Sequence, residues 1–378
     1  MKILLIVNQF PFTSEAFIVK KIKGLLRRSH EIIICCSVHD KALHKKLFAG
    51  EEHIKIIEFN RKKFAKYLLI HPFEFIDKSR RQLWHRYIIH VVNHQKPALV
   101  HFEFSGLACY YLPVIKKLES PVVVSFRNSS EKINIESYKN RKEDLQQLFQ
   151  YAAAVHCVSA DVKNIIAPYC PIPQKIFINY PSLPVDYFKK ETGYQPKDML
   201  TILSIGRLHF KKGYLMGLLA VKELAQKQNN FQWIIIGEGE MQEEINMYIH
   251  TLGLQHNVQL AGTKYNDEIK QAYANADIFL LPSFTEGIAN VALEAMSMEL
   301  PVVSTNCGGM AELIEHNVNG LLANVFDPHS IAEQLQKLMN DFELRKRLGI
   351  AARNTVVNNF NIERQIDVFE EWYKKIAK

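Results

Sequence analysis

Short apolar runs alternate with segments of helical periodicity along the whole chain, and this alternation is what most constrains its fold. The runs of the first half are Lys2–Val7, Glu31–Cys36, Ile54–Phe59, Leu99–Phe104, Val122–Phe126 and Ala153–Val158. Runs without polar alternation are typical of strands buried on both faces, as in a parallel sheet covered by helices. The sequence therefore predicts an α/β fold built on a doubly wound parallel sheet.

The second half repeats this design, and its apolar runs end in loops that contain glycine or proline. These runs are Met199–Ile205, Trp233–Ile236, Val258–Leu260 and Asp277–Leu281. Parallel strands bring their carboxyl ends to one edge of a sheet, and ligands of such sheets bind beyond that edge. We therefore expect a ligand at the loops that follow these four runs.

The length of 378 residues exceeds what one hydrophobic core organises, so the sequence predicts two domains. We place the first at residues 1–190 and the second at residues 191–355, with a hinge in the polar segment Lys189–Asp198. Amphipathic helices are expected at Ser330–Leu348 and Asn361–Ile376, and residues 356–378 form a separate C-terminal helix.

Charge is divided unevenly between the two halves. Residues 1–190 carry 30 Lys and Arg against 16 Asp and Glu, a net charge of +14, whereas residues 191–378 carry 17 against 23, a net charge of −6. The first half is therefore the part drawn to polyanions, such as nucleic acid, anionic lipid headgroups or a lipid diphosphate. Residues 60–86 mix basic and aromatic side chains, which suits an anionic membrane surface and equally suits helices with cationic outer faces.

Two glutamates stand eight residues apart in the stretch Leu280–Gly309. In a continuous helix Glu286 and Glu294 would lie roughly 12 Å apart along the axis, which is too far for the paired carboxylates of a glycoside hydrolase. The spacing suits the two ends of one elongated ligand. Between the glutamates, a helix N-terminus would present free backbone N–H groups to an anion. These N–H groups belong to Gly287, Ile288, Ala289 and Asn290.

Two motifs in this half resemble the donor-site signature of retaining glycosyltransferases of family 4. The segment PSFTEGIANVALE, residues 282–294, matches P-S-x-x-E-G within E-x7-E and is followed by Pro301-Val302-Val303 and Gly308-Gly309. The segment GRLHFKKG, residues 206–213, matches G-R-L-x-x-x-K-G. The likeness is strong over residues 199–330 and weak over 1–190. It is closest to bacterial members that build exopolysaccharide, capsule and lipopolysaccharide.

The resemblance implies a GT-B fold, in which two Rossmann-like domains with doubly wound parallel sheets face a cleft. The first domain would receive a saccharide or lipid-linked saccharide acceptor, and the second would hold a nucleotide-diphosphate sugar. The last helix would cross back to the first domain, with Trp372 and Tyr373 as its anchors. The implied reaction is transfer of a hexose with retention at the anomeric carbon, in cell-surface polysaccharide biosynthesis.

The resemblance also assigns roles in the second domain. Arg207 and Lys212 would stabilise the charge that grows on the leaving diphosphate, and Glu286 would hold hydroxyls of the donor sugar. Glu294 would receive the ribose hydroxyls. The further donor-binding positions are Gly206, Gly237, Ala261, Gly262 and Thr263, together with Gly287, Ile288, Ala289 and Asn290. Cations after a strand and exposed helical glutamates are common, so each role taken alone also has a purely structural reading.

The first half departs from the family pattern at three places, which makes Ser14, Glu103 and Arg127 the acceptor-side candidates. The loop after the first strand lacks G-x-G-x-x-G and instead resembles the S-E-T-F-I segment of polysaccharide-building members, although a helix cap at Ser14 explains it equally well. Glu103 and Arg127 stand where relatives often carry histidine. Arginine stays protonated and cannot act as a base, so Arg127 either binds a phosphate or hydroxyl or is a solvated loop residue.

No D-x-D, H-E-x-x-H or P-loop motif occurs in the sequence, so we expect neither a metal nor another cofactor besides the nucleotide sugar. The six cysteines lack metal-type spacing and are expected to be reduced and buried. No apolar run reaches the ~18 residues that span a bilayer. We therefore expect a cytoplasmic protein, peripheral on the inner face of the membrane, that does not bind nucleic acid.

Two rival functions stay open. A nucleotide-sugar epimerase on the same fold would consume donor without an acceptor. A catalytically inactive nucleotide-sugar-binding subunit is the second rival, because the loops at Glu103 and Arg127 are altered.

Overall fold

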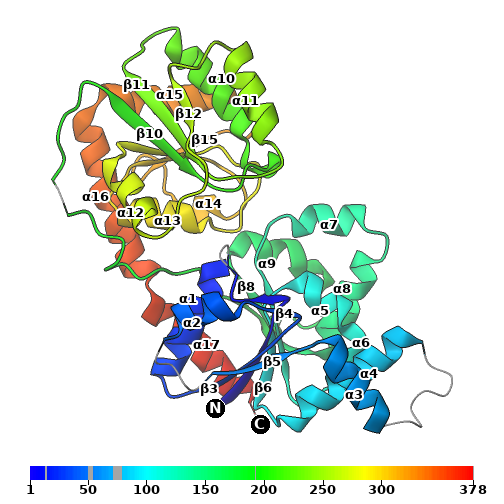
Figure 1. Cartoon of the computed structure of the whole chain (residues 1–378). Coiled ribbons are helices and arrows are strands. Elements are labelled where there is room, and N and C mark those ends of the chain that lie inside the picture. Colours follow the sequence, from blue (N-terminus) through cyan, green and yellow to red (C-terminus); the bar gives the residue numbers. More distant parts are fainter. Residues whose placement is uncertain (13–14, 50–53, 71–78, 192, 378) are drawn as a thin grey trace. The chain divides into compact units, whose positions relative to one another are not determined.

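The computed structural model describes residues 1–12, 15–49, 54–70, 79–191 and 193–377 (Figure 1). The chain divides into two compact units. Unit 1 comprises Met1–Arg127, Glu131–Tyr180 and Ile362–Lys378, and unit 2 comprises Asn128–Ser130 and Pro181–Asn361. The main boundaries thus lie after residues 180 and 361, where the sequence placed them after residues 190 and 355.

A seven-stranded parallel sheet organises unit 1, in the order β5-β3-β1-β6-β7-β8-β9. The strands are β1 (Lys2–Ile6), β3 (Glu31–Cys36), β5 (Ile54–Glu58), β6 (Leu99–Phe102), β7 (Val122–Phe126), β8 (Ala152–Cys157) and β9 (Ile176–Ile178). The chain builds outward from β1 to β5 and then returns to place β6 beside β1. The predicted doubly wound sheet is therefore confirmed, with its switch point between β1 and β6.

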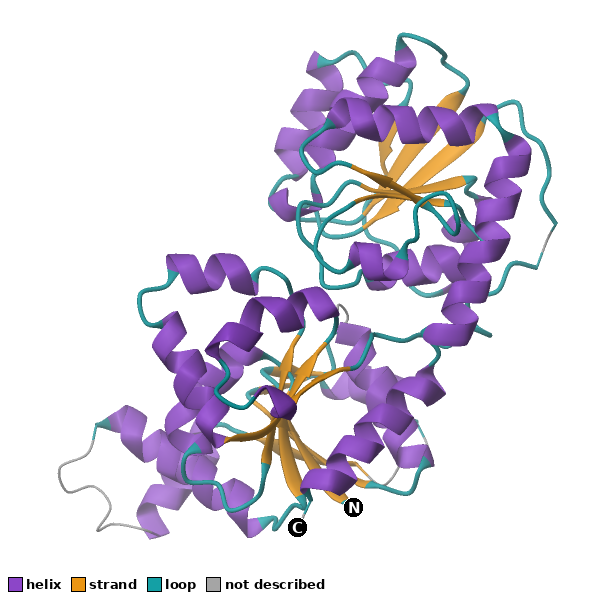
Figure 2. Ribbon diagram, turned by 180° about the vertical axis from the view of Figure 1, so that it is seen from behind, coloured by secondary structure: helices purple, strands orange, loops and turns teal. Residues whose placement is uncertain are grey.

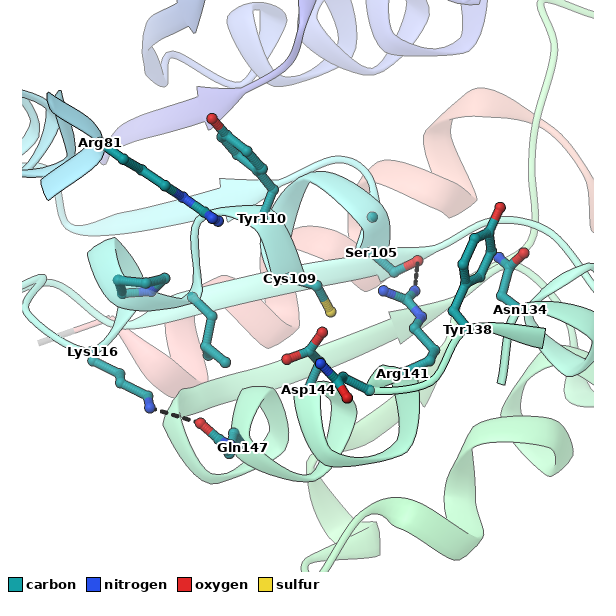
Figure 3. A pocket seen from close by; sticks show the side chains of 14 residues that line it. Arg81, Ser105, Cys109, Tyr110, Lys116, Asn134, Tyr138, Arg141, Asp144 and Gln147 are labelled. Atoms are coloured by element: carbon teal, nitrogen blue, oxygen red, sulfur yellow. Dashed lines mark hydrogen bonds between the residues drawn. The ribbon is translucent and has the colours of Figure 1, made fainter. Parts of the chain in front are cut away.

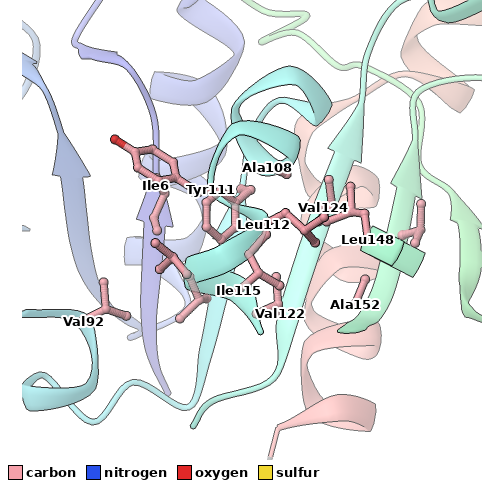
Figure 4. Close-up of a cluster of buried hydrophobic side chains, with 14 of the residues drawn as sticks. Ile6, Val92, Ala108, Tyr111, Leu112, Ile115, Val122, Val124, Leu148 and Ala152 are labelled. Atoms are coloured by element: carbon pink, nitrogen blue, oxygen red, sulfur yellow. The ribbon is translucent and has the colours of Figure 1, made fainter. Parts of the chain in front are cut away.

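Helices cover both faces of this sheet, as Figure 2 shows. They are α1 (Ala16–Arg27), α2 (Lys41–Leu47), α3 (Arg61–Ile70), α4 (Arg80–His94), α5 (Ser105–Tyr110), α6 (Leu112–Ile115), α7 (Glu131–Ser137), α8 (Arg141–Tyr151), α9 (Ala160–Ile166) and α17 (Ile362–Ile376). On one face, side chains of α4, α6 and α8 pack against the strands (Figure 4). Because the strands are buried on both sides, their sequences are almost continuously apolar.

The other face of the unit 1 sheet is covered by α1 and α17. Ile366, Phe369 and Tyr373 of α17 are fully buried in this core. Trp372 stacks on Phe177 of β9, with ring centroids 4.5 Å apart. The amide of Asn179 also donates to the carbonyl of Gln365 at 2.9 Å. The last helix is therefore an integral part of unit 1.

Unit 2 repeats the architecture with a six-stranded parallel sheet, in the order β12-β11-β10-β13-β14-β15. Its strands are β10 (Leu200–Ile205), β11 (Phe231–Ile236), β12 (Val258–Leu260), β13 (Ile278–Leu281), β14 (Val302–Thr305) and β15 (Leu321–Ala323). Its helices are α10 (Tyr214–Ala225), α11 (Gln242–Thr251), α12 (Asp267–Asn275), α13 (Asn290–Ser297), α14 (Met310–Leu313), α15 (Pro328–Asn340) and α16 (Phe342–Asn359). Trp233 is fully buried at its centre and donates to Ser204 at 2.9 Å.

The single helix expected over Ser330–Leu348 is wrong, because the chain breaks it at Asp341. Asp341 has extended backbone angles, and its side chain accepts from the N–H of Leu344 at 2.8 Å. An aspartate in this conformation is a strong N-cap, so it ends α15 and starts α16. Both helices contribute buried apolar residues to the core of unit 2, so apolar positions occur on both sides of the break.

Among the described residues, none of the helices combines the length and the apolar character needed to span a bilayer.

Candidate functional site

The loops at the carboxyl edge of the unit 2 sheet are tied together by backbone hydrogen bonds. The N–H of Gly237, after β11, donates to the carbonyl of Gly262, after β12, at 2.9 Å. The N–H of Leu208, after β10, donates to the carbonyl of Glu238 at 2.9 Å. These bonds bring the predicted positions Gly206, Gly237, Ala261, Gly262 and Thr263 to one edge, in adjoining loops after β10, β11 and β12.

Lys212 and Glu286 meet at this edge as an ion pair. The Nζ atom of Lys212 lies 2.6 Å from Oε1 of Glu286, and the side chains are 25% and 13% exposed. The hydroxyl of Ser283 donates to the same carboxylate oxygen at 2.9 Å. The structure therefore joins two residues that the sequence keeps 74 positions apart, and it holds the carboxylate in a fixed orientation.

The backbone around this pair requires glycine at two positions. Gly213 has a φ of +65°, and a Cβ atom there would overlap the carbonyl oxygen of Pro282. Gly308 has a φ of +52°, and a Cβ atom there would overlap the carbonyl oxygen of Glu286. Close approach and a left-handed conformation both exclude other residues. These contacts give a physical reason for the glycines that end the GRLHFKKG segment and follow β14.

Helix α13 begins at Asn290, three residues after Gly287, and the N–H groups at its start are free. Ala289 is its N-cap residue and supplies no side-chain hydrogen bond. Within the described parts of the chain, the amides of Gly287, Ile288, Ala289 and Asn290 donate to no acceptor. Unsatisfied donors at a helix N-terminus, together with the helix dipole, favour a bound anion.

Glu294 lies one turn into α13 and is oriented by a tyrosine that the sequence analysis missed. The hydroxyl of Tyr273, on α12, lies 3.1 Å from the carboxylate of Glu294 and 3.1 Å from the carbonyl of Val291. Burial, reinforced by the negative charge of Glu294, raises the pKa of Tyr273 well above its usual value, so the hydroxyl remains a donor. An apolar helix position was the only signal in the sequence for Tyr273.

Arg207 is exposed at the same edge. Its guanidinium group makes no ion pair and no side-chain hydrogen bond with any part of the chain that the structure describes. It differs in this from Lys212, which already has a carboxylate partner. Arg207 is therefore available to bind an anionic ligand at this edge.

The acceptor-side candidates of unit 1 fall into two groups. Ser14 lies outside the described residues. Glu103 is fully buried and pairs with Lys21 of α1 at 2.6 Å and with Arg127. Arg127 also donates from Nε to the carbonyl of Glu103 at 3.0 Å and is only 13% exposed. The reading of Arg127 as a solvated loop residue is therefore wrong, because a buried carboxylate needs its charge.

Burial shapes the electrostatics of this cluster. It lowers the pKa of Lys21 to about 8, against the opposing effect of Glu103. For Glu103 burial alone would raise the pKa, but Lys21, His101 and Arg127 together hold it well below its usual value. Glu15, half-buried at the start of α1, has its pKa raised to about 7, mainly by burial. The cluster thus has one carboxyl group that titrates near neutral pH.

Unit 1 also contains a hollow of about 700 Å³ between α5, α6, α7 and α8 (Figure 3). Arg141 is nearly buried in its wall, paired with Glu131 at 2.5 Å and donating to Ser105 at 3.1 Å. Amide, hydroxyl and cationic groups in the lining belong to Asn134, Tyr138, Asn140, Gln147, Tyr110, Arg81 and Lys116. The other lining residues are Gly106, Cys109, Leu112, Pro113 and Asp144. No pattern in the sequence indicates this hollow, because its lining residues come from separate parts of the chain that only the fold brings together.

Comparison with known proteins places these features in context. The sequence profile of the family described as glycosyl transferases group 1 matches residues 188–355. The amylovoran biosynthesis glycosyltransferase AmsK of Erwinia amylovora is 34% identical over 70% of this chain and 66% of its own length. The putative colanic acid biosynthesis glycosyltransferase WcaL of Salmonella typhimurium is 30% identical over 52% of this chain and 51% of its own length. The chain thus spans about half to two thirds of these relatives.

Two solved structures share the fold over nearly all of both chains. Alr3699/HepE of Anabaena, in complex with UDP and glucose, superposes with a TM-score of 0.80 at 18% identity and covers 99% of this chain and all of its own. The sucrose-phosphate synthase of Thermosynechococcus elongatus gives a TM-score of 0.80 at 14% identity, over 99% and 98% of the two chains. At these identities the likeness concerns the fold, and it confirms the expected GT-B architecture.

Proposed function

Because residues 188–355 match the profile of the group 1 glycosyltransferases, we propose that the chain transfers a hexose from a nucleotide-diphosphate sugar to a saccharide or lipid-linked saccharide, with retention at the anomeric carbon. One observation carries this proposal. The Lys212–Glu286 pair and the free amides of α13 lie at the same edge of unit 2, so a sugar and a diphosphate find complementary groups there.

The reaction breaks the bond between the anomeric carbon and the β-phosphate oxygen, and negative charge grows on the leaving diphosphate. Arg207, Lys212 and the α13 amides supply positive charge and donors to that oxygen, which lowers the barrier to bond breaking. The acceptor hydroxyl then bonds to the same face of the anomeric carbon. Its proton passes to the departing phosphate, so the step balances without a protein base.

Glu286 and Glu294 hold the two ends of the donor in this proposal. The Glu286 carboxylate accepts from sugar hydroxyls, and its bonds from Lys212 and Ser283 keep it in place. Glu294, oriented by Tyr273, accepts from the ribose hydroxyls. The nucleobase then lies at the loops after β11 and β12, around Gly237 and Gly262. Donor groups that are already positioned reduce the entropy lost on binding.

Unit 1 contributes acceptor-binding groups in this proposal. Glu103 is too deeply buried to touch a substrate, so it acts by positioning Arg127 and Lys21. The hollow beside Ser105 offers the hydroxyl and amide groups that saccharides bind. The names of AmsK and WcaL place those relatives in polysaccharide biosynthesis, and we propose the same pathway class here. We further propose that the enzyme works in the cytoplasm at the inner face of the membrane.

The test is a panel of UDP-, GDP- and ADP-sugars, each with and without a panel of p-nitrophenyl pyranosides. Diphosphate release that depends on the pyranoside supports the proposal. Isomerisation of the sugar without a pyranoside supports the epimerase, and binding seen by thermal shift without turnover supports the inactive subunit. Because protein cations and a helix dipole supply the charge, we expect full activity in EDTA. An absolute requirement for Mn²⁺ would contradict metal independence.

A further inference from the structure

Two phenylalanines form an exposed aromatic stack at the edge of unit 2. Phe284 follows β13 and Phe326 follows β15, each by three residues. Their ring centroids lie 4.2 Å apart with an interplanar angle of 30°. Phe326 is 66% exposed, so one large apolar face is open to solvent. Exposed apolar faces of this kind often mark binding sites.

The turn that carries Phe326 has a strained backbone and is held by hydrogen bonds on either side. Phe326 has a φ of +61°, which is rare for any residue except glycine and unfavourable for a bulky one. Asn324 and Asp327 fix the turn on either side: Asn324 donates to Asp327 at 3.2 Å, and Asp327 accepts from the N–H of Ser330 at 2.9 Å. The turn therefore holds the Phe326 ring in one position. The strained backbone costs free energy, and an exposed ring buries too little apolar surface in the folded chain to offset that cost.

The stack lies beside the groups assigned to the donor sugar. The N–H of Phe284 donates to the carbonyl of Lys211 at 2.7 Å, next to Lys212. The loop after β14, whose strand lies between β13 and β15, also contacts the donor-sugar groups, since the N–H of Gly309 donates to the carbonyl of Glu286 at 3.2 Å. In the strand order, β15 is the edge strand opposite β12. The stack is therefore at the sugar end of the site, away from the loops assigned to the nucleobase.

We propose that the Phe284–Phe326 stack is the platform on which a pyranose ring of the acceptor saccharide lies. The C–H face of a pyranose is apolar and flat, so it packs on an aromatic ring while its hydroxyls remain hydrogen-bonded at the rim. The donor hexose already has polar partners in Glu286 and the α13 amides, whereas Phe326 lies one loop beyond them. This inference rests on the proposed function and names a residue that determines acceptor binding.

The experiment compares Phe326→Ala, Phe326→Tyr and Met247→Ala in the full chain. Met247 is the matched control, since it is an apolar residue of unit 2 that is 57% exposed on α11. The substrates are the nucleotide sugar and p-nitrophenyl pyranoside that turn over fastest in the panel. We expect Phe326→Ala to raise KM for the pyranoside about tenfold, as befits one lost ring contact. KM for the nucleotide sugar and its acceptor-free hydrolysis stay within about twofold of wild type.

Phe326→Tyr keeps the ring and should restore the wild-type KM, and Met247→Ala should not change it. Thermal melting controls for folding, and Phe326→Ala should lower Tm by only a few degrees, because the ring loses its stack on Phe284 but is otherwise exposed. An unchanged pyranoside KM in Phe326→Ala, or an equal rise in the nucleotide-sugar KM, would overturn the platform while leaving the proposed function intact. A wild-type protein that transfers to no pyranoside would overturn both.

Discussion

At the residue scale, the Lys212–Glu286 pair shows how one carboxylate can bind a lysine first and the proposed sugar hydroxyls afterwards. Glu286 binds Lys212 and Ser283, so its charge would already be compensated when the proposed donor arrives. A lysine engaged in this way can shift toward a growing phosphate charge without first losing its own hydration shell. The pair is only partly buried, so it contributes little to stability and is suited to changing partners.

Lys212→Ala and Glu286→Ala are each expected to reduce kcat by roughly 10²- to 10³-fold, because each removes a group aimed at charge or hydroxyls in the transition state. The cost in unfolding free energy should be only about 1 kcal/mol. Steady-state rates and urea denaturation measure the two effects. Lys227→Ala, which removes an exposed lysine paired with Glu223 at 2.9 Å, is the matched control. Wild-type rates in both site variants would refute the assignment.

Glu15 makes a separate prediction about pH. Its pKa is about 7 in the folded protein against an ordinary value of 4.5, so the folded state holds a proton between pH 4.5 and 7 that the unfolded state has released. By linkage, stability falls as pH rises through this window. Because Glu15 is only half-buried, we expect an effect of about 1 kcal/mol. Glu15→Gln should remove this part of the decline, measured by urea denaturation at pH 5 and pH 8.

The control for that comparison is Glu136→Gln, at an exposed position of α7. It should reproduce the wild-type profile. Parallel profiles for wild type and Glu15→Gln would show that the Glu15 carboxyl does not titrate in this window.

Local motifs encode Lys212 and Glu286, so both residues were predicted before the structure brought them together as an ion pair. Lys21 and Tyr273 were missed because their partners, Glu103 and Glu294, are far away in the chain. A lysine on the inner face of an amphipathic helix, between Ile18 and Leu25, was the available signal for Lys21. Only the fold reveals which buried charge such a lysine meets.

At the element scale, the apolar runs predicted most strands because parallel strands are buried on both faces. The prediction of one helix over Ser330–Leu348 was wrong because apolar residues occur on both sides of the N-cap residue Asp341. In the sequence, Asp341 marks the break. Apolar periodicity therefore predicts which segments are helices or strands, whereas capping residues such as Asp341 determine where those elements begin and end.

Gly213→Ala tests the turn between β10 and α10. The left-handed φ and the overlap with Pro282 together predict a loss of roughly 3 kcal/mol or more in unfolding free energy, and displacement of Lys212. Gly253→Ala is the matched control: its φ is +69°, but its nearest neighbour is the flexible end of Lys222 at 4.0 Å. That variant should cost only about 1 kcal/mol and keep full activity. Equal costs in urea denaturation would show that the contact with Pro282 is unimportant.

At the scale of the whole molecule, positive charge is concentrated in the first half of the chain. This half also contains a hollow of about 400 Å³. Arg61, Arg80 and Arg81 line it beside Trp84 and Tyr110. Leu69 and Ile70 are 82% and 64% exposed at the end of α3. Phe73 and Phe75, two aromatic residues of the segment 60–86, lie outside the described residues. This surface supports the proposal of an anionic membrane partner.

We expect the protein to sediment with phosphatidylglycerol vesicles at 50 mM salt and to be released at about 0.5 M, where the Debye length is a few ångströms. Arg80→Ser with Arg81→Ser should weaken binding several-fold. Lys374→Ser with Lys375→Ser removes the same charge from an exposed part of α17 and should have little effect. Equal binding to neutral phosphatidylcholine vesicles would contradict the electrostatic proposal.

The return of α17 to unit 1 has a consequence for biosynthesis. On the ribosome, unit 1 is begun first and finished last, because the helix that covers α1 and β8 is translated only after all of unit 2. Until then Ile22 and Val123 lack part of the apolar surface that buries them in the complete protein. Nascent unit 1 therefore exposes apolar surface that chaperones bind. A stop codon that removes only the last helix would leave this surface exposed permanently.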